Sequence, residues 1–172
     1  MLTRIAVVSS ILCLILPAAG FAQGFSQGDK VFTLNGNGMS DQDFDTTTFS
    51  VSGSFSYFFT DKIEGAIRQN VGFSDIEDSG SNWSGTTRAA VDYSFDMGRL
   101  WPFVGGTIGY IYGDGVHDTG IIGPEAGLRV FVNQTTFILG AIEWDFFFDS
   151  GDDEDALDDS VFIYTVGIGF RW

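Results

Sequence analysis

Nine charged residues occupy alternate positions in otherwise apolar segments, where a β-conformation would place them on one face. Five are carboxylates and four are arginines. Such groups can line a path for polar solutes or neutralise each other. Because unpaired charges inside a protein are costly and the two signs nearly balance, we expect an ion-pair network that fills the interior. A polar solute path is the alternative. The set is Glu64, Arg68, Arg88, Asp92, Glu125, Arg129, Glu143, Asp145 and Arg171.

A catalytic site built on histidine and serine would involve His117, the only histidine of the chain. A serine nucleophile has to lie within hydrogen-bond reach of its base. No serine lies near His117 in the sequence, and no serine of the predicted strands can be tied to it. We therefore predict no catalytic residue and do not expect an enzyme.

Four polar segments combine many carboxylates with an absence of lysine and arginine. Carboxylate oxygens suit Ca²⁺ and Mg²⁺, and the residues 41–45 begin like an EF-hand loop. The glycine that should follow Asp45 is missing, however, and Ser52 stands at the twelfth position. We predict no defined metal site and no cofactor, but weak association of divalent cations with the most acidic segment. The segments are 39–45, 74–84, 113–120 and 149–159.

The first 22 residues have the pattern of a secretory signal peptide. Arg4 precedes an apolar stretch from Ile5 to Leu16, and Gly20 and Ala22 form a small-residue cleavage site before Gln23. The only cysteine, Cys13, lies within this segment. Cleavage would leave residues 23–172 as one exported domain without a thiol or disulfide.

The charge of the chain excludes nucleic-acid binding, which needs clustered basic residues. The full sequence has 8 Lys and Arg against 23 Asp and Glu, and removal of Arg4 with the signal peptide leaves 7 − 23 = −16. A hydrophobic content of 44% also excludes intrinsic disorder.

The mature chain is organised by a two-residue period. In 48–59, serines alternate with large apolar residues, which is typical of a strand with two different faces. Arg68 and Asp92 flank residues 79–81 symmetrically, so we expect them to face each other on adjacent strands. Short and long connections alternate, as in an up-and-down meander. The predicted strands lie near 30–38, 46–59, 63–73, 85–97, 101–112, 121–132, 136–148 and 160–172.

The choice of the inward face decides the fold class. A soluble eight-stranded barrel would need its aromatic face inside, but such a barrel has an interior only just filled by side chains. About thirty large apolar side chains do not fit there. Glycine and serine suit a narrow lumen, and phenylalanine suits lipid. We therefore predict an all-β, eight-stranded antiparallel up-and-down transmembrane β-barrel, with its apolar face outward and its edges closed.

Three sequence segments resemble the small eight-stranded outer-membrane β-barrel proteins of Gram-negative bacteria, the OmpA/OmpX-like group. They are 101–110 (WPFVGGTIGY), 123–131 (GPEAGLRVF) and 164–172 (YTVGIGFRW). The resemblance implies an integral outer-membrane location beside lipid and lipopolysaccharide. It also implies that the last strand is read by the outer-membrane assembly machinery, although the family usually ends in Phe. The residues of this assembly signal would be Tyr164, Val166, Ile168, Phe170 and Trp172.

The functions of that family are diverse, and a fold alone does not specify a function. We expect a structural or surface-interaction role, with a plugged polar lumen, the short turns in the periplasm and the acidic connections outside. A narrow passage for small solutes is the first alternative. A lipid-modifying outer-membrane enzyme is the second.

Overall fold

The computed structural model describes residues 24–40, 47–76, 80–114, 118–148 and 160–172. The predicted signal peptide and the acidic segment 149–159 lie outside the described residues. In the part that is described, no helix is long and apolar enough to cross a membrane.

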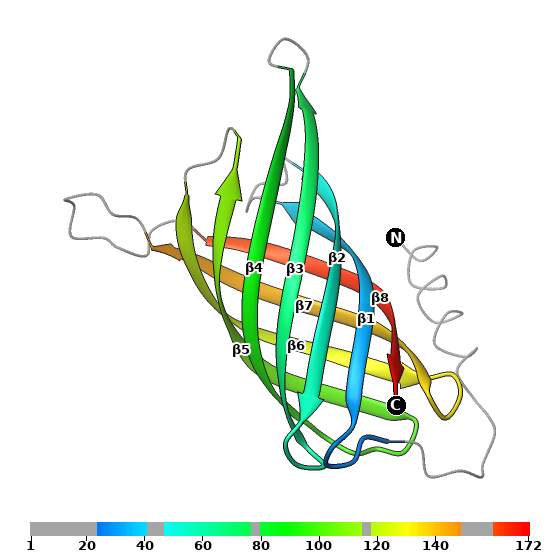
Figure 1. Ribbon diagram of the computed structural model, residues 1–172. Helices are drawn as coiled ribbons and strands as arrows, with labels where there is room; N and C mark the ends of the chain where they lie inside the picture. The colour runs from blue at the N-terminus through cyan, green and yellow to red at the C-terminus, as the bar shows by residue number, and fades with distance from the viewer. Residues whose placement is uncertain (1–23, 41–46, 77–79, 115–117, 149–159) are drawn as a thin grey trace, which may run out of the picture.

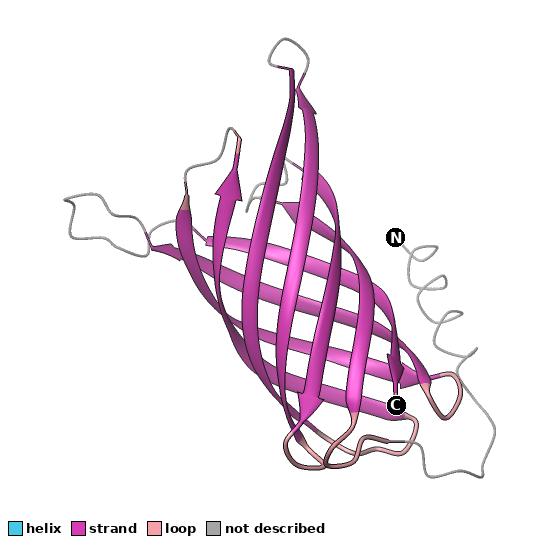
Figure 2. Cartoon of the chain, in the orientation of Figure 1, coloured by secondary structure: helices cyan, strands magenta, loops and turns pink. Residues whose placement is uncertain are grey.

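Eight strands form a single closed barrel in chain order (Figure 1). Each strand pairs antiparallel with the next, and β8 pairs with β1 to close the wall. Figure 2 shows that strands make up almost all of the described chain. The strands are β1 (Lys30–Ser40), β2 (Thr47–Phe58), β3 (Ile63–Ile76), β4 (Gly80–Ser94), β5 (Leu100–Gly113), β6 (Thr119–Phe131), β7 (Thr136–Phe148) and β8 (Ser160–Arg171).

The faces of the strands follow the sequence alternation. On β2, Ser52, Ser54 and Ser56 are buried in the lumen, whereas Val51 and Phe55 are about half exposed on the outer wall. Large apolar side chains cover the outside of the barrel on the remaining strands as well, whereas their inward faces carry both polar and apolar residues. A closed wall satisfies the backbone hydrogen bonds internally, so this outer face suits a lipid environment.

Two of the sequence predictions need comment. The connection predicted at 74–84 is mostly strand, because β3 continues to Ile76 and β4 begins at Gly80, paired with each other. The Gly-rich β5 has the predicted facing, with Val104, Ile108 and Tyr110 outward and Thr107 inward.

A cluster of buried apolar residues, here called the aromatic cluster, fills the lumen at the end where the short turns lie. Its centre is Phe25, which precedes β1. The Phe25 ring stacks on Phe58 with centroids 4.2 Å apart and meets Trp101 edge-on at 5.2 Å. The cluster explains why the apolar Phe131 lies on the inward face of β6, beside polar residues such as Glu125 and Arg129. The cluster consists of Phe25, Val31, Phe58, Trp101, Phe103, Phe131, Phe137 and Leu139.

The segment that carries Phe25 is fastened to the barrel at several points. The Gly28 amide donates to the Phe58 carbonyl (2.9 Å), and the Gln27 amide donates to the Asp61 carboxylate (2.8 Å). Arg171 donates to the carbonyl of Gly24 and to the Asp29 carboxylate. These bonds hold the segment across the mouth of the lumen.

Replacing Phe25 by Ala should destabilise the barrel by about 3–5 kcal/mol, because it leaves a cavity among rings that cannot collapse. Phe32→Ala is the matched control, since that ring lies on the outer wall and is 44% exposed. Urea unfolding in detergent micelles measures both. An equal loss in the two variants would contradict a packing role for Phe25.

Candidate functional site

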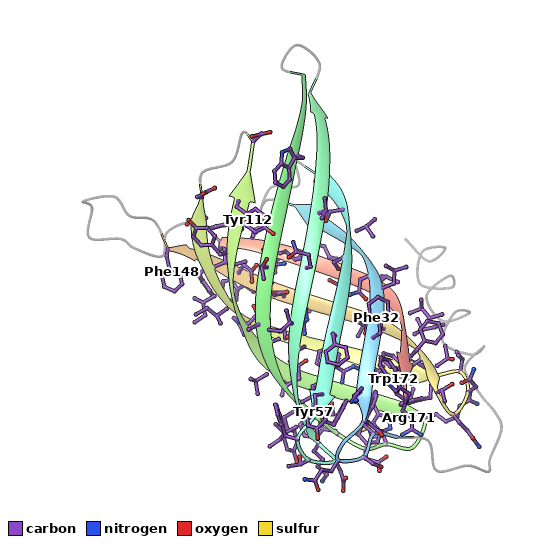
Figure 3. The ribbon with its side chains drawn as sticks, in the orientation of Figure 1. Phe32, Tyr57, Tyr112, Phe148, Arg171 and Trp172 are labelled. Atoms are coloured by element: carbon purple, nitrogen blue, oxygen red, sulfur yellow. The ribbon has the colours of Figure 1, made fainter. Side chains whose placement is uncertain are left out.

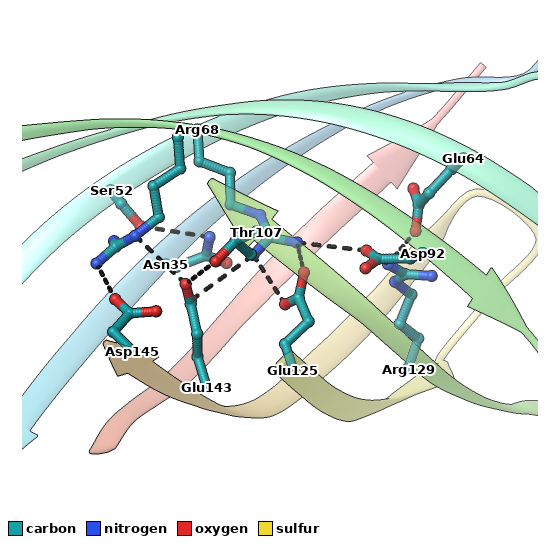
Figure 4. A network of polar contacts seen from close by, with 11 residues as sticks. Asn35, Ser52, Glu64, Arg68, Asp92, Thr107, Glu125, Arg129, Glu143 and Asp145 are labelled. Atoms are coloured by element: carbon teal, nitrogen blue, oxygen red, sulfur yellow. Dashed lines mark hydrogen bonds and ion pairs between the residues drawn. The ribbon is translucent and has the colours of Figure 1, made fainter. Parts of the chain in front are cut away.

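Three arginines in the lumen bind five carboxylates, and we call these eight residues the lumen network (Figure 4). Arg68, on β3, donates two hydrogen bonds of 2.8 Å to the carboxylate of Glu125 on β6. It also lies 3.3 Å from Asp92 and 3.9 Å from Glu143. One guanidinium group therefore crosses the lumen and joins strands that are not neighbours. The network consists of Glu64, Arg68, Arg88, Asp92, Glu125, Arg129, Glu143 and Asp145.

The second arginine, Arg88 on β4, connects two carboxylates of β7. Its Nη2 donates to Asp145 at 2.8 Å, and its Nε lies 3.3 Å from Glu143. Glu143 also accepts a 2.6 Å hydrogen bond from the Thr107 hydroxyl.

The third arginine, Arg129, joins the network to the aromatic cluster. It binds Glu64 and the Ser94 hydroxyl, and it lies 3.5 Å from Asp92. Its guanidinium carbon also sits 4.1 Å from the centre of the Phe103 ring. Cation–π contacts of this kind strengthen when the pair is removed from water.

The strand register brings four of the carboxylates into one row. Glu64 is paired with Asp92, Asp92 with Gly105, Gly105 with Glu125, and Glu125 with Glu143. Gly105 is the only position of this row from β3 to β7 without a side chain. A Cβ there would collide with the Asp92 carboxylate, so glycine makes room for Asp92 to lie across the wall.

Gly109 makes room for the Arg88 side chain in the same way. The two residues are paired across β4 and β5. A Cβ at Gly109 would lie 2.7 Å from Arg88 Cγ, well inside van der Waals contact. Asp92 and Arg88 of β4 are thus each paired with a glycine of β5.

The structure places eight of the nine predicted interior charges in the network, and it excludes Arg171. That residue lies at the short-turn end (Figure 3), where it pairs with Asp29 at 2.9 Å. It is the last residue of β8, paired with Val31 of β1, and its side chain reaches the segment before β1 instead of the middle of the lumen. The expected pairing of Arg68 with Asp92 is diagonal, because the direct partner of Arg68 in the register is Arg88.

The carboxylates of the network are shielded from bulk solvent. The five carboxylate side chains are at most 7% exposed. A cavity of about 40 Å³ lies beside them, and its wall on β1 and β2 carries small polar side chains such as Thr33, Ser52 and Ser54. The alternation in the sequence predicts that these residues lie on the polar face of their strands but does not predict the cavity. Asn35 belongs to the same wall and donates to Ser52 (3.4 Å).

The residues of the predicted assembly signal lie together on the outer face of β8. Tyr164, Val166, Ile168, Phe170 and Trp172 are all 40% exposed or more. Trp172 and Tyr57 mark the short-turn end of the outer wall in Figure 3, and Tyr112 and Phe148 mark the opposite end.

His117 lies outside the described residues. Among the residues that are described, no group of three or more His, Cys, Asp or Glu side chains has an arrangement that could hold a metal ion.

Arg68→Ala should lower the free energy of unfolding by about 3–5 kcal/mol, because it leaves the buried Glu125 carboxylate without its partner. Lys62→Ala, in the exposed turn between β2 and β3, should change it by less than about 0.5 kcal/mol. Denaturant unfolding compares the two variants. A loss at Arg68 as small as that at Lys62 would mean that water, not Arg68, solvates Glu125.

No known family model matches the sequence, and no curated protein matches it. Solved structures do match the fold. The outer membrane protein OprG from Pseudomonas aeruginosa is 12% identical, with a TM-score of 0.62 over 88% of this chain and 99% of that one. Neisserial surface protein A is 15% identical, with a TM-score of 0.59 over 84% and 96% of the two chains.

A transmembrane β-barrel designed de novo matches as well, with 14% identity and a TM-score of 0.55 over 87% of this chain and 99% of the design. A designed barrel and natural surface proteins thus match the same fold, which separates the fold from any one function. The chain has the fold of the small eight-stranded outer-membrane β-barrels.

Proposed function

We propose that this protein is an integral protein of the bacterial outer membrane, with a structural or surface-interaction role and a lumen that is closed to solutes. The observation that carries the proposal is the inversion of the barrel. Paired charges are buried inside, and aromatic and aliphatic side chains are exposed outside. This combination is favourable only where the surroundings of the barrel are apolar.

The ends of the outer wall support a membrane-spanning orientation. Tyr57, Phe59, Tyr93 and Phe95 form edge-on ring pairs near the short turns, and Trp83 and Tyr112 form another toward the opposite end. Aromatic residues at both rims are typical of barrels in membranes, where they lie at the headgroup level.

Two successive layers support a closed lumen. The aromatic cluster fills the short-turn end, and the lumen network crosses the middle of the barrel. Any solute would have to displace packed rings and then separate charges that are held by several bonds each. Both displacements are expensive in a space this narrow.

The acidic connections support the surface-interaction part of the proposal. They contain many carboxylates and no Lys or Arg, and on the outer surface they would lie beside anionic lipopolysaccharide. Divalent cations can bridge carboxylates to lipid phosphates, because both offer hard oxygen ligands. We expect weak Mg²⁺ or Ca²⁺ association there and a preference for basic partners.

The closed lumen predicts little or no ion conductance. Purified protein in planar bilayers should give no steady single-channel currents. A porin measured in the same bilayers shows that the assay detects an open barrel. Large, steady currents from the unmodified protein would contradict the closed lumen and favour a narrow passage for solutes.

Mass spectra of lipid A from cells with and without the protein test the enzymatic alternative. A lipid-modifying activity requires that the two sets of spectra differ.

The exposed apolar row of β8 predicts dependence on the assembly machinery. Trp172→Asp places a charge at the membrane interface and should reduce insertion, with degradation in the periplasm. Trp83→Asp is the matched control, since Trp83 is also exposed on the outer wall but lies on β4. Outer-membrane fractionation measures both. Normal levels of the Trp172 variant would count against the assembly signal.

A further inference from the structure

The lumen network does not balance its own charge. It contains three arginines and five carboxylates, and 3 − 5 = −2. Arg171 would have reduced this excess but lies at the rim. The remaining basic residues of the mature chain, Lys30, Lys62 and Arg99, belong to the short-turn end. Two uncompensated charges at such depth would cost several kcal/mol each.

The bonding pattern identifies the two surplus carboxylates. Glu125 is held by both of its oxygens, Glu143 by Thr107 and Arg88, and Glu64 by Arg129. Asp92 and Asp145 differ, because in each the Oδ2 atom meets an arginine while Oδ1 accepts no hydrogen bond from the described residues.

The surroundings of these two carboxylates are polar and confined. Asp92 faces Arg68 and Glu64 from β3 and Arg129 and Glu125 from β6. Asp92 also lines the 40 Å³ cavity, which has room for about three waters.

Asn35 gives independent evidence on the other side of that cavity. It lines the cavity, is only 5% exposed, and has an Oδ1 atom that accepts no hydrogen bond within the described chain. Asp145 faces Arg88 from β4 and has Glu143 beside it on β7.

We propose that the lumen binds two monovalent cations at its surplus carboxylates: a proton or an alkali-metal ion at Asp92, which lines the cavity, and a proton at Asp145, which does not line it. Each cation neutralises one charge that the three arginines leave uncompensated. Folding of the barrel then takes up cations from solution, and its stability depends on their concentration. This inference concerns the charge of the interior and goes beyond the proposed function.

Two series of unfolding measurements on the full barrel in detergent micelles test the proposal. The first varies pH from 5 to 9 at constant NaCl. If both cations are protons, the folded state binds two more protons than the unfolded state, so stability falls as pH rises. The folding equilibrium constant changes by up to about 100-fold per pH unit. The second series, at pH 8, replaces Na⁺ or K⁺ by N-methylglucamine, which is too large for the cavity. If an alkali-metal ion occupies the cavity beside Asp92, this replacement lowers stability.

The double variant Asp92→Asn/Asp145→Asn distinguishes the contribution of these two carboxylates from that of all other titratable groups. Its amides mimic neutralised carboxylates and keep His117 and the acidic connections unchanged. We expect it to lose both dependences and to be at least as stable as the unmodified protein at pH 8. Glu125→Gln is the control with the opposite expectation, because it removes a carboxylate that Arg68 needs and should destabilise the barrel.

Three outcomes would overturn the proposal. One is an unmodified protein whose stability is unchanged in both series. Another is a double variant that keeps the dependences of the unmodified protein. The third is a double variant destabilised as much as Glu125→Gln. The first of these outcomes is measured on the unmodified protein alone and does not require the variants to fold. These unfolding measurements do not involve conductance, so their outcome is independent of the test of the proposed closed lumen.

Discussion

Closure of eight strands into one wall leaves an interior barely wider than its side chains, and this limit governs the rest of the structure. A long side chain pointing inward needs a neighbour that takes no space. Gly105 and Gly109 give that space to Asp92 and Arg88. These two glycines of β5 are therefore a packing requirement of the charges on β4, although glycine weakens strands elsewhere.

The same narrow space is filled in two chemically different ways. Rings pack at the short-turn end, where the segment before β1 adds Phe25 from outside the barrel wall. Ion pairs span the middle, where each partner comes from the wall itself. Arg129 serves both regions, since its guanidinium group lies over Phe103 and binds Glu64. Replacing it would disturb the packing of one layer and the charge of the other together.

The alternation of residue types was enough to predict the eight strands, their facing and the membrane character of the wall. It also predicted which charges point inward and one of their ion pairs, Arg68 with Asp92, but not the others. Arg68 binds Glu125 across the lumen, and no periodicity reports a contact between β3 and β6. Arg171 has the correct parity but lies too near the rim. Phe25 could not be predicted, because it precedes the first strand and shows no alternation. Only the apolar Phe131 on a polar face hinted at the cluster.

The seam between β1 and β8 has a consequence for how the chain folds. It pairs Val31 with Arg171, two residues 140 positions apart (171 − 31), whereas every other seam joins consecutive strands. Contacts of such long sequence separation form slowly, because the entropy of closing the loop must be overcome first. Until the last strand arrives, β1 offers an unpaired edge to any neighbouring chain. A partly assembled barrel with an open edge is therefore unstable in lipid. During assembly, closure of the barrel competes kinetically with aggregation.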